Sequence, residues 1–244
     1  MGAVVRGRYA PSPTGALHPG NLRTALLAWL FARAVGGTFV LRMEDLDLPR
    51  VRSGAADAML DDLRWLGLDW DEGPYVGGPF GPYTQSARQA LYAAALARLR
   101  ARGDLYPCYC TRAELSRIAS APQQGDEPPR YPGTCRLLMA QDRAAREAQG
   151  RRPSLRFRAP AGTISFRDAL AGEVTETVAE VMGDFVVRRG DGIVAYQLAV
   201  VVDDALMGIT QVVRGADLLS STARQLALYD ALGYPRPQEF VHVP

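Results

Sequence analysis

One loop near the N-terminus concentrates residue types that can bind phosphate. Residues 8–21 read Arg-Tyr-Ala-Pro-Ser-Pro-Thr-Gly-Ala-Leu-His-Pro-Gly-Asn. They lie between a short apolar stretch and a pattern of helical period that ends at Gly36-Gly37. Such a loop leaves backbone N–H groups open at the start of the next helix, where they can bind an anion. His18, one of two histidines in the chain, lies there. The residues alone leave two interpretations about equally open: a site for nucleotide chemistry, or a simple connection.

Charged residues follow two apolar stretches that we predict to be strands. Residues 38–43 read as a buried strand followed by the acidic segment 44–47, and the strand 209–214 ends in an arginine. An open α/β sheet forms its ligand crevice at the carboxyl ends of its strands, so Glu44 and Arg214 are expected to face a site. The alternatives are a solvated acidic turn and a surface salt bridge.

Three cysteines and a tyrosine have a spacing that could bind a metal. Cys108-x-Cys110 is followed by Tyr131-x-x-x-Cys135, and three thiolates with one oxygen donor can complete a tetrahedral zinc site. Cysteines two residues apart on a strand point to opposite faces, so the first pair requires a turn. The alternative is that the cysteines are small buried apolar residues and Tyr131 is an ordinary tyrosine.

Length and composition are those of a globular protein. The 244 residues can bury a substantial core, as one large domain or one domain with an insertion. The net charge is only +2, and all 28 basic residues are arginine. Because no apolar run is long enough to cross a bilayer and the N-terminus lacks a secretion signal, we expect a cytoplasmic protein without membrane partners. Three cysteines in a reducing compartment argue against disulfides.

Residues 8–21 resemble the histidine signature of class I aminoacyl-tRNA synthetases, in the form found in the glutamyl branch. The Arg-Tyr-Ala-Pro-Ser-Pro-Thr-Gly sequence before the His-Pro-Gly-Asn makes the match specific. The resemblance extends through the Arg-Met-Glu-Asp-Leu-Asp segment at 42–47 to nearly the whole chain. It implies a Rossmann-like α/β catalytic domain with a zinc-containing inserted subdomain. It also implies a ligase that converts glutamate and ATP, with Mg²⁺, to glutamyl-adenylate.

The resemblance also implies roles for individual residues. It places Glu44 at the α-ammonium group of glutamate, and Tyr196 and Arg214 at the side-chain carboxylate. The residues implied to act on the phosphates during catalysis are His18, Gly20 and Asn21. The other residues implied to bind glutamate are consecutive: Arg8, Tyr9, Ala10, Pro11 and Ser12.

Three local patterns resemble the glutamyl-Q tRNA(Asp) synthetases within this branch. Their zinc pattern is similar to Cys-x-Cys…Tyr-x-x-x-Cys, whereas zinc-bearing glutamyl-tRNA synthetases tend to use Cys-x-Cys…Cys-x-His, and residues 105–182 contain no histidine. Glutamyl-tRNA synthetases usually read Tyr-Asn-Phe and Arg-Gly-Glu-Asp where this chain has Tyr196-Gln-Leu and Arg214-Gly-Ala-Asp. This resemblance implies a structural zinc ion and transfer of glutamate to queuosine in the anticodon of tRNA(Asp), and we expect a monomer.

Two other functions stay open at this point. One is the catalytic half of a conventional glutamyl-tRNA synthetase, and the other is a non-catalytic RNA-binding relative that keeps the fold. The expected organisation is a nucleotide-binding domain in two halves, 1–104 and 183–232, around an inserted zinc-binding, RNA-acceptor-like subdomain, 105–182. Residues 233–244 would begin a truncated C-terminal, stem-contact region. Its end resembles the segment just before the family's lysine-bearing loop, and the chain has no lysine, so we expect the natural protein to continue.

Overall fold

A six-stranded sheet forms the centre of the fold in the computed structural model, which describes residues 4–111, 113–115 and 130–244. Part of the predicted insertion, residues 112 and 116–129, lies outside the described residues. The strand order is β2-β1-β8-β9-β5-β6, and every neighbouring pair is parallel except the antiparallel pair β5 and β6. The strands are β1 (Arg6–Tyr9), β2 (Thr38–Leu41), β5 (Ile164–Asp168), β6 (Gly172–Glu176), β8 (Gln211–Gly215) and β9 (Glu239–Val243).

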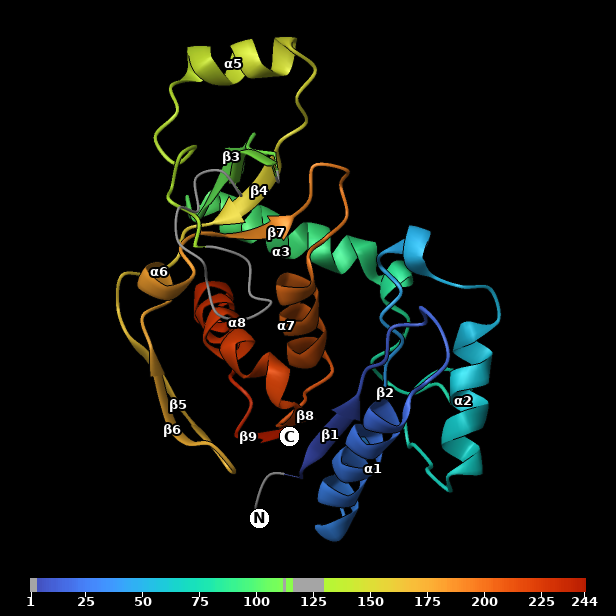
Figure 1. The fold of residues 1–244 in the computed structure, drawn as a ribbon. Helices are drawn as coiled ribbons and strands as arrows, with labels where there is room; N and C mark the ends of the chain where they lie inside the picture. Colours follow the sequence, from blue (N-terminus) through green and yellow to red (C-terminus); the bar gives the residue numbers. More distant parts are fainter. Residues whose placement is uncertain (1–3, 112, 116–129) are drawn as a thin grey trace.

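Helices cover both faces of this sheet (Figure 1). Strand β8 alternates between the faces: Val212 packs with α3 (Gln89–Ala101), α7 (Tyr196–Leu206) and α8 (Leu219–Leu232), whereas Val213 packs with α1 (Pro19–Ala34) and α2 (Ala55–Trp65). This follows from the period of two along a strand. Strands buried on both faces read as apolar runs, which is why 38–43 and 209–214 could be predicted. In the described parts of the chain, no helix combines the length and apolarity needed to cross a membrane.

A second, antiparallel sheet lies at the other end of the molecule (Figure 1). Its strands are β3 (Leu105–Cys108), β4 (Ser154–Phe157) and β7 (Phe185–Arg188), with α5 (Ala140–Ala148) beyond β3 and β4 and α6 (Val178–Val181) before β7. Neither sheet respects the expected boundary at residue 182. Strands β5 and β6 extend the main sheet from within 105–182, while β7 pairs with β4 from outside it. The division into domains stays a prediction.

The strand order of the sheet reverses between β1 and β8. From β1 the chain continues to β2 on one side, and from β8 to β9 on the other. The carboxyl ends of parallel strands meet at one edge, and a crevice opens where the order reverses. Three short 3₁₀ segments lie in the connections: η1 (Leu48–Arg50), η2 (Gln85–Arg88) and η3 (Ala216–Leu218). The fold therefore places the loop after β1, the residues after β2 and the end of β8 around one crevice.

Candidate active site

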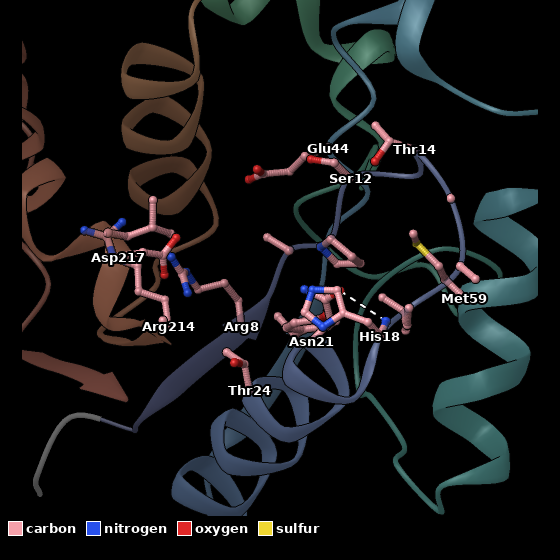
Figure 2. A pocket seen from close by; sticks show the side chains of 18 of the residues that line it. Arg8, Ser12, Thr14, His18, Asn21, Thr24, Glu44, Met59, Arg214 and Asp217 are labelled. Carbon is pink, nitrogen blue, oxygen red and sulfur yellow. Dashed lines mark hydrogen bonds between the residues drawn. The ribbon is translucent and has the colours of Figure 1, made fainter. Parts of the chain in front are cut away.

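A cavity of about 620 Å³ lies at this crevice (Figure 2). It is lined by every residue that the resemblance implied for catalysis or glutamate binding, except Gly20. Arg8 and Arg214 project into it from β1 and β8, whereas Met59 projects from α2 at the far end. The lining residues from the predicted set are Arg8, Tyr9, Ala10, Pro11, Ser12, His18, Asn21, Glu44, Tyr196 and Arg214. Their proximity follows from parallel strands that end at a common edge.

His18 forms the N-terminal cap of α1. Its ring nitrogen Nδ1 accepts a hydrogen bond from the backbone N–H of Gly20 at 3.1 Å. The backbone N–H of His18 donates to Asn21 Oδ1 at 3.3 Å. Because Nδ1 accepts, the neutral ring carries its proton on Nε2, which can donate to a ligand. Gly20 does not line the cavity but leaves room for the His18 ring. A Cβ atom at residue 20 would lie 2.9 Å from His18 Cε1, which is too close for a side chain. The helix start thus offers an imidazole donor and open N–H groups to an anion.

A buried ionic network lies beneath the cavity. Arg42 directly follows β2, and its side chain is fully buried. It donates to Glu44 Oε1 at 3.0 Å and to Asp204 Oδ1 at 2.7 Å. Arg8 Nε in turn donates to Asp204 Oδ2 at 3.2 Å. Asp203 lies 3.6 Å from Arg42 Nε. Burial favours a raised pKa for Glu44 and Asp204, but for Asp204 the charges of Arg8 and Arg42 outweigh it, and its pKa is lowered.

Arg214 is held differently from the other arginines of the site. Its guanidinium donates to His242 Nε2 at 2.9 Å, to Gln225 Oε1 at 2.8 Å and to Thr222 Oγ1 at 2.8 Å. All three acceptors are uncharged in this arrangement, and no carboxylate of the described residues lies within ion-pair distance of Arg214. Burial lowers the pKa of Arg214, and the charge of Arg8 acts in the same direction, although Tyr196 and Asp204 favour the charged form. The cavity therefore presents a cation that has no direct ion-pair partner among the described residues.

Several residues that shape the site were not predicted. Arg42, Asp203 and Asp204 fix the orientation of Arg8 and Glu44 from below. A signal was available, because two adjacent carboxylates that follow an apolar run in one helix are expected to be buried with partners. Arg52 and Asp217 also line the cavity, from the segments after β2 and β8. Their positions depend on the course of those loops, which the sequence pattern does not predict.

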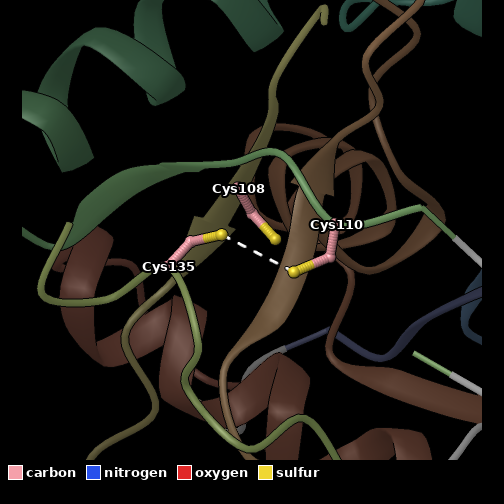
Figure 3. Close-up of side chains that lie close together, drawn as sticks. All are labelled: Cys108, Cys110 and Cys135. Atoms are coloured by element: carbon pink, nitrogen blue, oxygen red, sulfur yellow. Dashed lines mark hydrogen bonds between the residues drawn. The ribbon is translucent and has the colours of Figure 1, made fainter. Parts of the chain in front are cut away.

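The three cysteines come together in the antiparallel unit, by which we mean the sheet of β3, β4 and β7 with the described residues between β3 and β4 (Figure 3). Their Sγ atoms lie within 4.8 Å of one another, and Cys110 and Cys135 are 3.6 Å apart. Two thiolates on one tetrahedral zinc ion lie about 3.8 Å apart, because Zn–S bonds are about 2.3 Å long. The Tyr131 hydroxyl is 3.4 Å from Cys108 Sγ and 4.0 Å from Cys110 Sγ. Hydrogen bonding with Cys135, and to a smaller extent with Tyr131, contributes to lowering the pKa of Cys108 to about 4. The donor set fits a tetrahedral metal site.

Comparisons with known proteins agree with this geometry. Residues 4–244 match the family described as tRNA synthetases class I (E and Q), catalytic domain. A glutamyl-Q tRNA(Asp) synthetase of Symbiobacterium thermophilum is 61% identical over 98% of this chain and 73% of its own. Another, from Nitratidesulfovibrio vulgaris, is 55% identical over 99% and 74%. A glutamate–tRNA ligase of Halorhodospira halophila is 51% identical over 96% and 49%.

Solved structures are similar over the same region. The crystal structure of a glutamate–tRNA synthetase from Elizabethkingia anophelis superposes with a TM-score of 0.86 at 34% identity, covering 98% of this chain and 50% of that one. This chain spans about three quarters of the two glutamyl-Q relatives but about half of the glutamate–tRNA ligase and of the solved synthetase. The Rossmann-like parallel sheet and its flanking helices are thus shared along nearly the whole chain.

Proposed function

The chain belongs to the class I tRNA synthetases of the glutamate and glutamine group, a family of ligases, and we propose that it activates glutamate with ATP and transfers it to queuosine in the anticodon of tRNA(Asp). The observation that carries the glutamate assignment is the charge pattern of the cavity. Arg214 supplies a cation without a direct ion-pair partner among the described residues, while Arg8 and Glu44, each also in an ion pair, supply a second guanidinium and a carboxylate. A ligand with one ammonium and two carboxylate groups complements this pattern.

The proposed reaction needs no covalent enzyme intermediate. The α-carboxylate of glutamate attacks the α-phosphorus of ATP in line, the bond to the β-phosphate oxygen breaks, and pyrophosphate leaves with its electron pair. Positioning and charge stabilisation then account for catalysis. Glu44 would hold the α-ammonium group, and Arg214 with Tyr196 the side-chain carboxylate. The Nε2–H of His18 and the start of α1 would stabilise the phosphate oxygens. Mg²⁺ bound to the nucleotide would neutralise part of the phosphate charge.

Three features support queuosine over a 3′-terminal ribose as the acceptor. The two glutamyl-Q relatives are 61% and 55% identical, against 51% for the glutamate–tRNA ligase. The Cys-x-Cys…Tyr-x-x-x-Cys pattern and the Tyr196-Gln-Leu and Arg214-Gly-Ala-Asp segments resemble the same branch. The set of charged residues that line the pocket argues against a non-catalytic RNA-binding protein. A conventional glutamyl-tRNA synthetase activity is the second candidate, because ligases of that name match nearly the whole chain.

We further propose that zinc is the metal of the cysteine cluster, held by Cys108, Cys110 and Cys135 with Tyr131 completing the tetrahedron. Three sulfur donors favour zinc over magnesium or calcium, which prefer oxygen ligands. The metal would have a structural role, since its ligands leave no coordination position for a substrate. It would join the turn after β3 to the segment before α5, which are far apart in the sequence.

Transfer of labelled glutamate tests the function. We expect ATP-dependent labelling of tRNA(Asp) that carries queuosine, no labelling of tRNA(Asp) with guanosine at that position, and no labelling of tRNA(Glu). Labelling should survive removal of the 3′-terminal adenosine of tRNA(Asp), because the proposed acceptor is a base in the anticodon. Labelling of tRNA(Glu) alone would assign a conventional synthetase. The absence of glutamyl-adenylate with every tRNA would refute both.

A further inference from the structure

A buried histidine lies directly behind Arg214. His242 is on β9, which pairs with β8 so that the two residues are in register. Both side chains are almost fully buried, with 4% of each residue exposed. Arg214 Nε donates to His242 Nε2 at 2.9 Å, and the Thr222 hydroxyl lies 3.2 Å from the same nitrogen. Because Arg214 has no acceptor function, His242 Nε2 must be the acceptor and cannot carry a proton.

The other ring nitrogen of His242 faces a carboxylate. Nδ1 lies 2.7 Å from Asp168 Oδ2, which also accepts from the His242 backbone N–H at 3.1 Å. The second oxygen of Asp168 accepts from the backbone N–H groups of Leu170 and Ala171. This carboxylate is fixed at the end of β5 and selects the Nδ1–H tautomer, as an acceptor beside one ring nitrogen generally does. The tautomer leaves Nε2 free to accept from Arg214.

We propose that the Asp168–His242 pair positions Arg214 for the side-chain carboxylate of glutamate, and that protonation of His242 releases this clamp. The proposal rests on the proposed function, because it names the device that orders the glutamate-binding cation. Protonated His242 would present an N–H group to the N–H of Arg214, replacing a hydrogen bond by repulsion between two cations. Arg214 would lose one of its three acceptors and turn away from the position that the ligand requires. Glutamate binding should therefore weaken in acid.

The groups around His242 determine the pH range in which it takes up a proton. The charged groups that face it are Asp168 from β5, Arg214 from β8 and, farther away, Arg8 from β1; Thr222 of α8 is neutral. Asp168 favours the charged imidazolium, but burial and the two arginines oppose it, and the pKa of His242 is lowered from its ordinary value of 6.5. The residue is therefore neutral near pH 7 and takes up a proton only below pH 6.5. Glutamate keeps its side-chain carboxylate ionised there, since that group has a pKa of about 4.3.

Calorimetric titration of the protein with glutamate between about pH 5 and pH 8 provides the test. If the protonated form does not bind, the apparent Kd should rise up to about tenfold for each pH unit below the pKa of His242. The variant H242Q keeps an acceptor near the position of Nε2 but does not titrate. It should bind glutamate within about threefold of the wild type at pH 7.5 and lose the part of the acid dependence that His242 causes, leaving that of Glu44, whose pKa is raised. A wild-type affinity that does not change with pH, or an unchanged acid dependence in H242Q, would overturn the proposal.

Two controls separate other causes. The chain has one other histidine, so H18Q must retain the acid dependence of glutamate binding if His242 causes it. The variant H242L removes the acceptor and should weaken glutamate binding at every pH; if it does not fold, H242Q still decides.

Nitrogen NMR of the His242 ring gives a result that is independent of glutamate binding. The His242 signals, identified by their loss in H242Q, should show an Nδ1–H tautomer at neutral pH, and an Nε2–H tautomer would contradict the arrangement. Failure to bind glutamate at any pH, with the Nδ1–H tautomer present, would refute the proposed function instead.

Discussion

At the scale of single residues, charge balance determines what the cavity can bind. Three arginines and three carboxylates in and beneath the cavity pair with one another: Arg8, Arg42 and Arg88 with Glu44, Asp203 and Asp204. Burying an ion is costly unless a partner compensates it, and this network satisfies that condition. Arg214 stands outside it, buried with uncharged acceptors. A ligand carboxylate would supply the missing charge, so Arg214 should contribute more to binding than the paired arginines.

Replacing Arg214 by alanine should therefore weaken glutamate binding strongly. Losing one partner of a desolvated charge pair costs about 2–5 kcal/mol, which corresponds to a rise in Kd of roughly 30- to 5,000-fold. ATP binding should change little, because among the described residues no hydrogen bond joins Arg214 to the start of α1, which would hold the phosphates. The matched control is R236A, which removes an arginine of similar size from a surface ion pair with Asp230. Normal glutamate affinity in R214A would show that another group binds the carboxylate.

The residues of the cavity and those beneath it differ in how far the sequence predicts them. His18, Glu44 and Arg214 stand in motifs at strand ends, and parallel strands bring such positions together whatever the details of packing. Asp203 and Asp204 lie inside α7, and their partners come from β1, the residues after β2 and η2. Such contacts depend on how the helix is rotated against the sheet. Local pattern carries no information about that rotation, so the partners could not be predicted.

At the scale of elements, the start of α1 departs from common capping chemistry. Helices prefer serine, threonine, aspartate or asparagine at the N-cap, whereas here an imidazole nitrogen takes that place. The sequence predicts the helix, but propensity alone would not assign His18 this contact. The arrangement links structure to function, because the capping bond to Gly20 N uses Nδ1 and leaves Nε2–H for a ligand.

The antiparallel unit should depend on its metal. Protein purified without added metal should contain about one zinc per chain, and C110S should reduce that content, since the thiolate is the ligand that favours zinc. Because metal binding is coupled to folding, loss of zinc should accelerate amide hydrogen exchange in β3 and β4 while β1 and β8 keep their protection. The control M139A alters an exposed side chain in the same unit and should keep its zinc. Unchanged exchange after removal of the metal by a chelator would refute a structural role.

At the scale of the whole molecule, segments distant in sequence complete the main sheet. Asp168 of β5 pairs with Phe240 of β9, so a strand from the expected insertion extends the sheet beyond the last strand of the chain. This pairing also places Asp168 beside His242 and hence behind Arg214. The sequence predicts the strands at 38–43 and 209–214 from their apolar runs, but the pairing partner of a strand is a long-range property. For this reason neither the strand order nor the Asp168–His242 pair could be predicted.

The buried charges of the whole molecule predict two stages of acid destabilisation. His242 has a lowered pKa in the folded protein. Below its ordinary value of 6.5 the unfolded chain therefore binds more protons than the folded protein, and the stability decreases as the pH is lowered. Asp204 and Asp168 also have lowered pKa values, so their contribution is present above 3.8 and is lost as pH falls through their folded values. Glu44, whose pKa burial raises, acts in the opposite direction between 4.5 and its higher folded value. The first stage therefore begins below 6.5, with a slope from His242 of at most about 1.4 kcal/mol per pH unit. Urea unfolding across this range should show that slope in the wild type and its loss in H242Q, while the decline below 3.8 persists in both. Equal slopes below 6.5 in the wild type and in H242Q would contradict a neutral buried His242.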